Sequence, residues 1–228
     1  MRDYLKKSEV WSAVMLFGLH VIFFPVMVGL MAEIWPDFLT GQEYNFLYYC
    51  VSAVLTFVLL GGFLRRSFDS LADNLLGCAK YFLFGWLVYY ALSILAGIAL
   101  LLLGVTESSP NDMALDALLQ EQRGMMLAVI LFIAPVVEEC IFRGGVFCGL
   151  YRKNRVLAYV VTILLFSMYH IWQYLVVFRD WTYLLFLISY LPASFTLCWV
   201  YEKSGSIWTS VAFHMSNNLY AWLTLSNM

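Results

Sequence analysis

The sequence predicts an all-α fold, a polytopic transmembrane helical bundle of about seven to eight helices. The first observation is composition: 63% of the 228 residues are apolar and 12% are charged, whereas soluble domains average about half apolar and about a quarter charged. The second is that the apolar residues gather in runs long enough to cross a hydrocarbon core of about 30 Å at about 1.5 Å per residue. With a net charge of −2, these features exclude an ordinary soluble domain, a disordered chain and a nucleic-acid binder with a basic face.

Seven apolar runs predict seven membrane-spanning helices in a single integral membrane domain that covers residues 1–228. The first run is too long for the apolar core of a cleaved signal peptide, and no small-residue cleavage site follows it. We find no internal repeat and no long linker that would indicate a second domain. The runs cover Trp11–Ile34, Phe46–Leu64, Tyr81–Leu103, Met125–Tyr151, Val156–Phe178, Thr182–Tyr201 and Ser206–Leu225.

Two connectors between these runs carry apolar residues at helical spacing and are predicted to be short amphipathic segments. One extends from Arg66 to Lys80. The other begins at Ser109-Pro110, because proline favours the first turn of a helix. We expect both to be plain connectors near the membrane interface.

The distribution of Lys and Arg predicts a multi-pass protein with a cytoplasmic N-terminus. In that orientation the inside segments hold ten of the thirteen basic residues, and the outside segments hold Arg123 and Arg179. Cytoplasmic loops of membrane proteins carry such an excess of Lys and Arg. An odd number of helices then places the C-terminus outside. The ten inside residues are Arg2, Lys6, Lys7, Arg65, Arg66, Lys80, Arg152, Lys153, Arg155 and Lys203.

Three charged residues fall within one predicted helix. Thirteen of the fifteen acidic residues lie outside the apolar spans or at their ends, and the other two are Glu138 and Glu139, followed by Arg143. Ionisable groups inside a bilayer are costly and usually functional. Residues four apart are neighbours on a helix, so Glu139 is predicted to pair with Arg143, which leaves Glu138 without a partner on its own helix. Pro135 removes a backbone hydrogen bond and can kink the helix at this point.

Two histidines and one asparagine are predicted to lie near Glu138. His170 is in the fifth run, and His214 is in the seventh with Asn218 one turn further on. Counting from the inner helix ends places Glu138 and His170 about 20 Å deep, and His214 and Asn218 roughly 12 and 18 Å deep. The four residues are therefore expected to meet near the bilayer midplane. His20 has no acidic or amide neighbour at helical spacing and is predicted to be a packed or hydrogen-bonded imidazole.

Two chemistries suit this set, and both predict hydrolysis, most simply of a peptide bond. In the first, Glu138 is a general base that deprotonates a water, and His170 assists it. His214 and Asn218 then donate hydrogen bonds to the oxyanion of a tetrahedral intermediate. In the second, Glu138, His170 and His214 bind Zn²⁺, which activates the water. We favour the first chemistry, which requires no cofactor, because asparagine is a poor zinc ligand and no HExxH motif is present.

Three motifs on three predicted helices resemble those of the CPBP family of intramembrane endopeptidases, also called Abi or CAAX-processing proteases. The segment Glu138–Gly144 matches EExxxR followed by glycine, Phe166 with His170 matches FxxxH, and His214 with Asn218 matches HxxxN. The resemblance covers about residues 125 to 228, the motif-bearing catalytic half of the chain. It implies an intramembrane protease in which the first glutamate activates water and the first histidine assists. It also implies that the second histidine and the asparagine form the oxyanion hole.

The substrate that the resemblance implies is a membrane-associated protein or peptide, such as a prenylated CAAX tail, a C-terminal sorting signal or a peptide precursor. The short loops favour recognition within or near the lipid bilayer. Two other functions stay open at this point: a non-catalytic membrane immunity or binding protein that uses the same polar pocket, and a proton-coupled transporter. No nucleic-acid partner is expected, and the sequence does not predict the oligomeric state or the role of residues 1–124.

Overall fold

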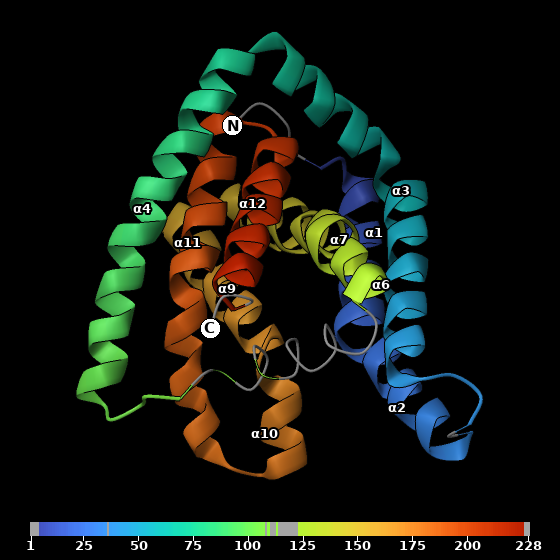
Figure 1. The fold of residues 1–228 in the computed structure, drawn as a ribbon. Coiled ribbons are helices and arrows are strands. Elements are labelled where there is room, and N and C mark those ends of the chain that lie inside the picture. Colours follow the sequence, from blue (N-terminus) through green and yellow to red (C-terminus); the bar gives the residue numbers. More distant parts are fainter. Residues whose placement is uncertain (1–4, 36, 108, 110–112, 114–122, 226–228) are drawn as a thin grey trace.

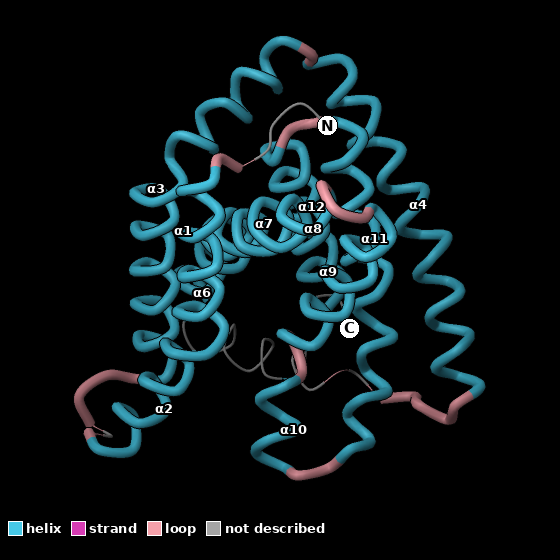
Figure 2. Tube along the Cα trace, turned by 180° about the vertical axis from the view of Figure 1, so that it is seen from behind, coloured by secondary structure: helices cyan, strands magenta, loops and turns pink. Residues whose placement is uncertain are grey.

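The computed structural model describes residues 5–35, 37–107, 109, 113 and 123–225 of the chain. Within these residues the regular secondary structure is helical and contains no β-strand (Figure 1, Figure 2). The predicted all-α fold is therefore confirmed. The helices surround one central helical run, which carries the three charged residues of the predicted site.

The N-terminal half of the described chain contains three long helical runs. The first consists of α1 (Lys7–Gly18), the π-helix η1 (Leu19–Phe23) and α2 (Phe24–Ile34). The second, α3 (Gly41–Asp73), begins at Thr40, whose hydroxyl accepts a hydrogen bond from the backbone N–H of Glu43, as in a capping box. The third, α4 (Leu75–Leu102), follows after one residue. The helices α3 and α4 consequently meet in the corner at the top of Figure 1.

The C-terminal half contains the central run and the helices that pack on it. The central run consists of α6 (Arg123–Ala128), the π-helix η2 (Val129–Ile133), α7 (Ala134–Glu139), the π-helix η3 (Cys140–Phe147) and α8 (Cys148–Tyr151). A broken span follows, in which α9 (Arg155–Tyr169) and α10 (Trp172–Phe178) are bent by 47°. The last elements are the 3₁₀-helix η4 (Trp181–Phe186), α11 (Leu187–Ser204) and α12 (Ile207–Leu225).

All seven predicted runs are helical. In the part of the chain that the structure describes, five continuous helices and the bent pair α9–α10 have the length and hydropathy of a membrane span. The seventh run, α12, is helical but does not reach that hydropathy, because it carries polar residues such as Ser210, His214 and Asn218. Contacts with α3, α4, α7 and α11 cover much of α12. Ser210, His214 and Asn218 therefore face other helices, on which each of them has a hydrogen-bond partner.

The prediction for the connector between Arg66 and Lys80 is wrong. The helix α3 continues to Asp73 and α4 begins at Leu75, so the connector is a corner between two long helices. Only Asn74 leaves the helical conformation, with φ −140° and ψ 48°, because no proline interrupts the segment. The predicted segment that begins at Ser109-Pro110 lies almost wholly outside the described residues.

The central run is the best buried of the candidate spans: 61% of its apolar window is buried, against 6% for α4. Two adjacent glycines let its neighbours approach closely. A Cβ atom on Gly144 would lie 3.0 Å from the ring of Phe63 in α3, and one on Gly145 would lie 3.0 Å from Cβ of Ala13 in α1. Since α1, α3, α9 and α12 all contact the central run, its polar residues lie in the interior of the bundle.

Candidate functional site

A cavity of about 650 Å³ lies beside the central run, between α3, α9, α11 and α12. This volume is typical of pockets that bind small ligands or short peptide segments. Glu138, His170, His214 and Asn218 all line the cavity. The structure therefore brings these four residues to one cavity, although they come from α7, α12 and the break between α9 and α10.

The buried ion pair forms as the helical spacing predicts. Arg143 Nη1 donates a hydrogen bond of 2.9 Å to Glu139 Oε1, and both side chains are fully buried. The other guanidinium nitrogen, Nη2, donates to the backbone oxygen of Ser194 in α11 at 3.1 Å. The ring of Phe166 covers the guanidinium carbon, with 4.2 Å to the ring centroid. This cation–π contact gives the phenylalanine of the FxxxH motif a physical role.

Glu139 also holds the helix α12. Ser210 Oγ donates to Glu139 Oε2 at 2.6 Å, and His214 Nδ1 lies 2.9 Å from Glu139 Oε1. Because a carboxylate only accepts, Nδ1 of His214 is the donor. Ser210 was not among the predicted site residues, and its only signal in the sequence is that it lies four residues before His214, on the same face of a helix. Glu139 thus neutralises Arg143 and orients His214 at the same time.

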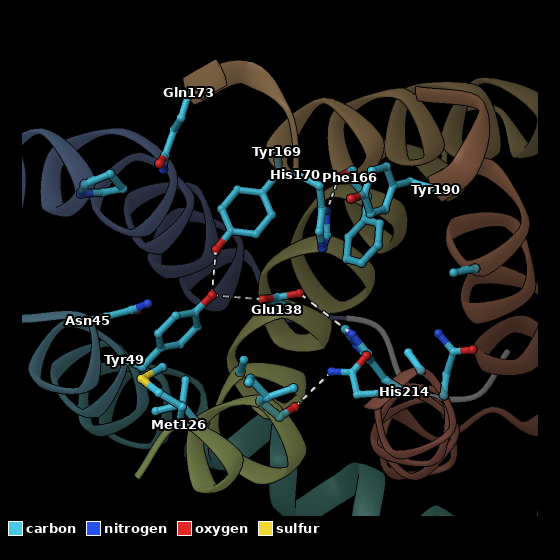
Figure 3. Close-up of a pocket in the computed structure, with 18 of the residues that line it drawn as sticks. Asn45, Tyr49, Met126, Glu138, Phe166, Tyr169, His170, Gln173, Tyr190 and His214 are labelled. Atoms are coloured by element: carbon cyan, nitrogen blue, oxygen red, sulfur yellow. Dashed lines mark hydrogen bonds and ion pairs between the residues drawn. The ribbon is translucent and has the colours of Figure 1, made fainter. Parts of the chain in front are cut away.

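Glu138 has a different environment from Glu139, as predicted. The residue is 4% exposed, and its Oε1 accepts a hydrogen bond of 3.3 Å from the Tyr49 hydroxyl of α3. Its Oε2 lies 3.9 Å from Nε2 of His214. Figure 3 shows Tyr49 and Tyr169 on one side of this carboxylate and His170 and His214 on the other. Tyr49 was not predicted, because a contact between residues 89 positions apart leaves no local pattern.

His170 lies at the break in the fifth span. The helix α9 ends at Tyr169, and His170 Nδ1 donates to the backbone oxygen of Phe166 at 2.9 Å. The imidazole also stacks on the ring of Tyr190, with 4.7 Å between centroids and 23° between planes. When Nδ1 donates, Nε2 of the neutral ring carries the lone pair. The bend of 47° between α9 and α10 therefore presents a fixed acceptor nitrogen at the cavity wall.

Asn218 is tied to the central run. Its Nδ2 donates to the backbone oxygen of Ile130 at 2.9 Å. In a π-helical turn this carbonyl would accept a hydrogen bond from the backbone N–H five residues later. That residue is Pro135, which has no backbone N–H. The side chain of Asn218 supplies the missing donor. An amide nitrogen carries two hydrogens, so the second remains for a ligand in the cavity.

The zinc alternative needs three ligands that converge on one point. Among the described residues, no group of three His, Cys, Asp or Glu side chains is arranged to hold a metal ion. His214 Nδ1 is already bonded to Glu139, and the predicted trio of Glu138, His170 and His214 does not form such a group. The described residues therefore do not fit a zinc ion in this arrangement.

Comparison with known proteins adds a family match for the half of the chain that carries the site. Residues 121–220, which include all three motifs, match the family described as type II CAAX prenyl endopeptidase Rce1-like. A Bacillus subtilis (strain 168) protein named "Putative membrane peptidase YdiL" is 25% identical over 136 residues, which cover 59% of this chain and 51% of that protein. A Lactococcus lactis subsp. lactis (strain IL1403) protein named "UPF0177 protein YxdF" is 31% identical over 88 residues, which cover 39% and 43%. The chain spans about half the length of these curated relatives. No solved structure matches it significantly.

Proposed function

We propose that this chain, which carries a CPBP-family endopeptidase domain over residues 121–220, hydrolyses a peptide bond of a membrane-associated substrate with Glu138 as the water-activating base. One observation carries the proposal. Two adjacent carboxylates in the interior of a helical bundle have opposite surroundings. Among the described residues, Glu139 accepts hydrogen bonds from Arg143, Ser210 and His214, whereas Glu138 accepts one from Tyr49. Both oxygens of Glu139 therefore hold neighbouring side chains in place. In Glu138 the Tyr49 bond involves Oε1, and Oε2 can accept a proton from water.

The reaction begins with a water held between Glu138 Oε2 and the two histidines. Glu138 takes one proton from this water while the water oxygen attacks the carbonyl carbon of the substrate. Nε2 of His170, which carries a lone pair, accepts the second hydrogen of the water and orients it. The tetrahedral intermediate collapses when the carbon–nitrogen bond breaks, and Glu138 returns its proton to the departing amine.

His214 and Asn218 stabilise the oxyanion of this intermediate. Because Nδ1 of His214 donates to Glu139, its Nε2 is a donor only when the ring is an imidazolium. That state balances the charge of the site, since Glu138 and Glu139 are then matched by Arg143 and His214. Asn218 contributes its second amide hydrogen. Preorganised donors act strongly here because the surrounding helices exclude water and lower the local dielectric.

The position of the cavity opening indicates from which side of the membrane a substrate can enter. Its exposed lining residues include Gly41, at the start of α3, Gln173 in α10 and Thr224, near the end of α12. The start of α3, the helix α10 and the C-terminal end of α12 all lie on the side of the bundle that faces away from the α3–α4 corner (Figure 1). The basic residues concentrate at the corner end, so the positive-inside rule predicts a cytoplasmic corner. We propose that the N-terminus is cytoplasmic, that the C-terminus is outside, and that the cavity opens on the extracytoplasmic side.

This orientation favours some of the implied substrates over others. A scissile segment must reach the cavity from the extracytoplasmic side or from the outer half of the bilayer. The C-terminal sorting signal of an exported protein and a secreted peptide precursor meet this requirement. The lipidated tail of a cytoplasmic protein does not. The wall is aromatic and polar, so the segment is expected to be uncharged where it contacts Tyr49, Tyr190 and Asn217.

The catalytic proposal is tested by comparing membrane proteomes of cells that express the parent chain and Glu138→Gln. We expect peptide termini that depend on the parent chain to disappear in the variant, because an amide cannot take the proton of water. Asp69→Asn is the matched control, since Asp69 is an exposed carboxylate on α3 far from the cavity mouth and its variant keeps all cleavages. Retention of the same termini in Glu138→Gln overturns the mechanism and favours a binding protein that uses the pocket for recognition.

The orientation is tested without catalysis. Single cysteines are placed at Thr224→Cys, at the cavity mouth, and at Lys153→Cys, an exposed position between α8 and α9. We expect a membrane-impermeant maleimide to label the first variant in intact cells and the second only after permeabilisation, with the parent chain as the background for native cysteines. The reverse pattern refutes the extracytoplasmic cavity and leaves the role of Glu138 untouched.

A further inference from the structure

A second cluster of buried polar side chains lies directly behind Tyr49, on the side of Glu138 away from the two site histidines. It contains His20 of η1, Ser52 of α3 and Tyr169 at the end of α9. His20 Nδ1 lies 2.9 Å from Ser52 Oγ, and His20 Nε2 lies 3.0 Å from the Tyr169 hydroxyl. The Tyr169 hydroxyl lies 3.1 Å from that of Tyr49, which contacts Glu138 at 3.3 Å. Four hydrogen bonds therefore connect Ser52 to the proposed base.

His20 is placed in this cluster by an unusual stretch of backbone. It is fully buried and lies in the π-helical segment Leu19–Phe23 between α1 and α2. π-helical turns are rare and occur often at functional sites. A buried imidazole is costly unless its nitrogens are hydrogen-bonded, and both nitrogens of His20 have partners. The prediction of a hydrogen-bonded imidazole is thus confirmed. The sequence did not indicate that its partners connect His20 to Glu138 through Tyr169 and Tyr49.

The number of available protons determines the direction of these bonds. Glu138 as a carboxylate only accepts, so the Tyr49 hydroxyl donates to it. The Tyr49 oxygen then accepts from Tyr169, which has no second proton for His20. The Tyr48 hydroxyl, which lies 2.9 Å from Nε2, gives its hydrogen to the backbone oxygen of His20. Nε2 of His20 therefore carries the hydrogen and donates it to Tyr169, while Nδ1 accepts from Ser52. Every bond then holds one proton, whereas the opposite tautomer requires Tyr48 to leave the backbone oxygen and donate to Nε2.

Tyr48 lies beside this chain of bonds and contacts two of its members. Its hydroxyl donates to the backbone oxygen of His20 at 2.9 Å, and the hydroxyl oxygen lies 2.9 Å from Nε2 of His20 and 3.3 Å from the Tyr169 hydroxyl. Its ring stacks on the imidazole with 4.8 Å between centroids. Because its single hydrogen is used on the backbone, Tyr48 passes no proton toward Glu138 and can only accept part of the Nε2–H bond. Tyr48 is therefore a matched control for Tyr49, because it is the adjacent residue of the same type on the same helix.

We propose that the chain of bonds from Ser52 through His20 and Tyr169 to Tyr49 is a one-way series of donors that holds Glu138 in its reactive orientation. The proposal rests on the proposed function, in which Glu138 is the base. The Tyr49 bond occupies Oε1, so Oε2, on the side of His214, is the oxygen that takes the proton from water. His20, Tyr169 and Tyr49 are positioning residues, since each acts through the next and not on the reacting atoms.

The kinetic test compares Tyr49→Phe, Tyr169→Phe and Tyr48→Phe on a substrate whose cleavage Glu138→Gln abolishes. We expect Tyr49→Phe to lower kcat roughly ten- to a hundredfold, the size expected for one hydrogen bond to a charged acceptor, with KM changed less than about twofold. Tyr169→Phe is expected to lower kcat by a smaller factor, and Tyr48→Phe is expected to keep a kcat close to that of the parent chain. An equal loss in all three variants, or a loss of kcat that follows thermal stability, overturns the proposal.

Two substitutions at His20 separate positioning from packing. His20→Gln keeps a side-chain N–H near the place of Nε2 and is expected to retain most of kcat. His20→Leu fills the space without a donor and is expected to match Tyr169→Phe. A stable, folded His20→Leu variant with the kcat of the parent chain refutes the proposal.

The tautomer is a spectroscopic signature that needs no substrate. Nitrogen-15 NMR of histidine-labelled protein reports which ring nitrogen carries hydrogen, and the signal of His20 is the one that His20→Gln removes. We expect the Nε2–H form. An Nδ1–H form refutes the one-way series even if cleavage depends on Glu138. Conversely, cleavage that survives Glu138→Gln refutes the proposed function, while the His20 signal still reports on the chain of bonds.

Discussion

Replacing Glu139 by alanine tests the assignment of the two adjacent carboxylates to different roles. Glu139 accepts hydrogen bonds from Arg143 at 2.9 Å, Ser210 at 2.6 Å and His214 at 2.9 Å. Its removal leaves the fully buried Arg143 with Ser194 and the ring of Phe166 as its partners. Removing one member of a buried ion pair typically costs about 3–5 kcal/mol. For a chain of this size that corresponds to a Tm lower by roughly 6 to 20 °C.

The assay is thermal unfolding of the purified protein in detergent, with Glu138→Ala as the matched control. Within the part of the chain that the structure describes, Glu138 accepts one hydrogen bond, from Tyr49, and that hydroxyl keeps its bond to Tyr169 when the carboxylate is removed. We therefore expect Glu138→Ala to abolish cleavage and to change stability by less than about 1 kcal/mol. Equal losses of stability in Glu138→Ala and Glu139→Ala would refute the reasoning, because the two carboxylates would then contribute equally to the free energy of unfolding.

A double variant separates the structural and catalytic parts of the Glu139 role. Replacing a buried ion pair by apolar residues of similar volume is often neutral or stabilising. We expect Glu139→Met combined with Arg143→Met to recover most of the stability that Glu139→Ala loses. Cleavage stays absent, because His214 has then lost the acceptor that orients its ring. Recovery of cleavage together with stability would show that Glu139 acts only through folding.

Three further predictions concern the oxyanion hole, the packing of α4 and the metal. Asn218→Ala is expected to lower kcat by about 10²–10³, the usual effect of removing one oxyanion donor, and a change confined to KM would contradict this. Gly85→Ala places a Cβ atom 2.8 Å from Val200 and 2.9 Å from the ring of Phe213, so it is expected to lower the free energy of unfolding by about 1–3 kcal/mol. Gly97→Ala on the same helix meets no atom within 4 Å and is its control. Cleavage is expected to survive a zinc chelator, whereas stoichiometric zinc lost together with activity would overturn the metal-free mechanism.

Much of the fold follows from local patterns in the sequence. Apolar runs identified all seven helical segments, because the length of a run and its hydropathy are properties of neighbouring residues. The corner between α3 and α4 was missed for the same reason. Its sequence reads as an amphipathic connector, and only the packing of the two long helices shows that Asn74 alone leaves the helical conformation. The low hydropathy of α12 was overlooked because its apolar residues dominate the pattern.

The candidate site was partly predictable. The pairing of Glu139 with Arg143 follows from i, i+4 spacing, and the depth of the histidines follows from the helical rise. Tyr49 and Ser210 were not predictable, because each reaches the glutamates from a helix far away in the sequence, over 89 and 71 positions. The role of His20 was missed for the same reason, since its link to the site passes through Tyr169, 149 positions away.

The sequence by itself determined that this protein is a bundle of apolar helices with its intramembrane charge in one place, Glu138, Glu139 and Arg143. It also determined which glutamate has a partner on its own helix. The tertiary structure decided what surrounds the other one. Helix packing brings Tyr49 to Oε1 of Glu138 and His214 to the side of Oε2, the oxygen that we propose takes the proton from water. The physical reason is that backbone spacing sets contacts within a helix, whereas contacts between helices depend on side-chain packing that no local pattern encodes.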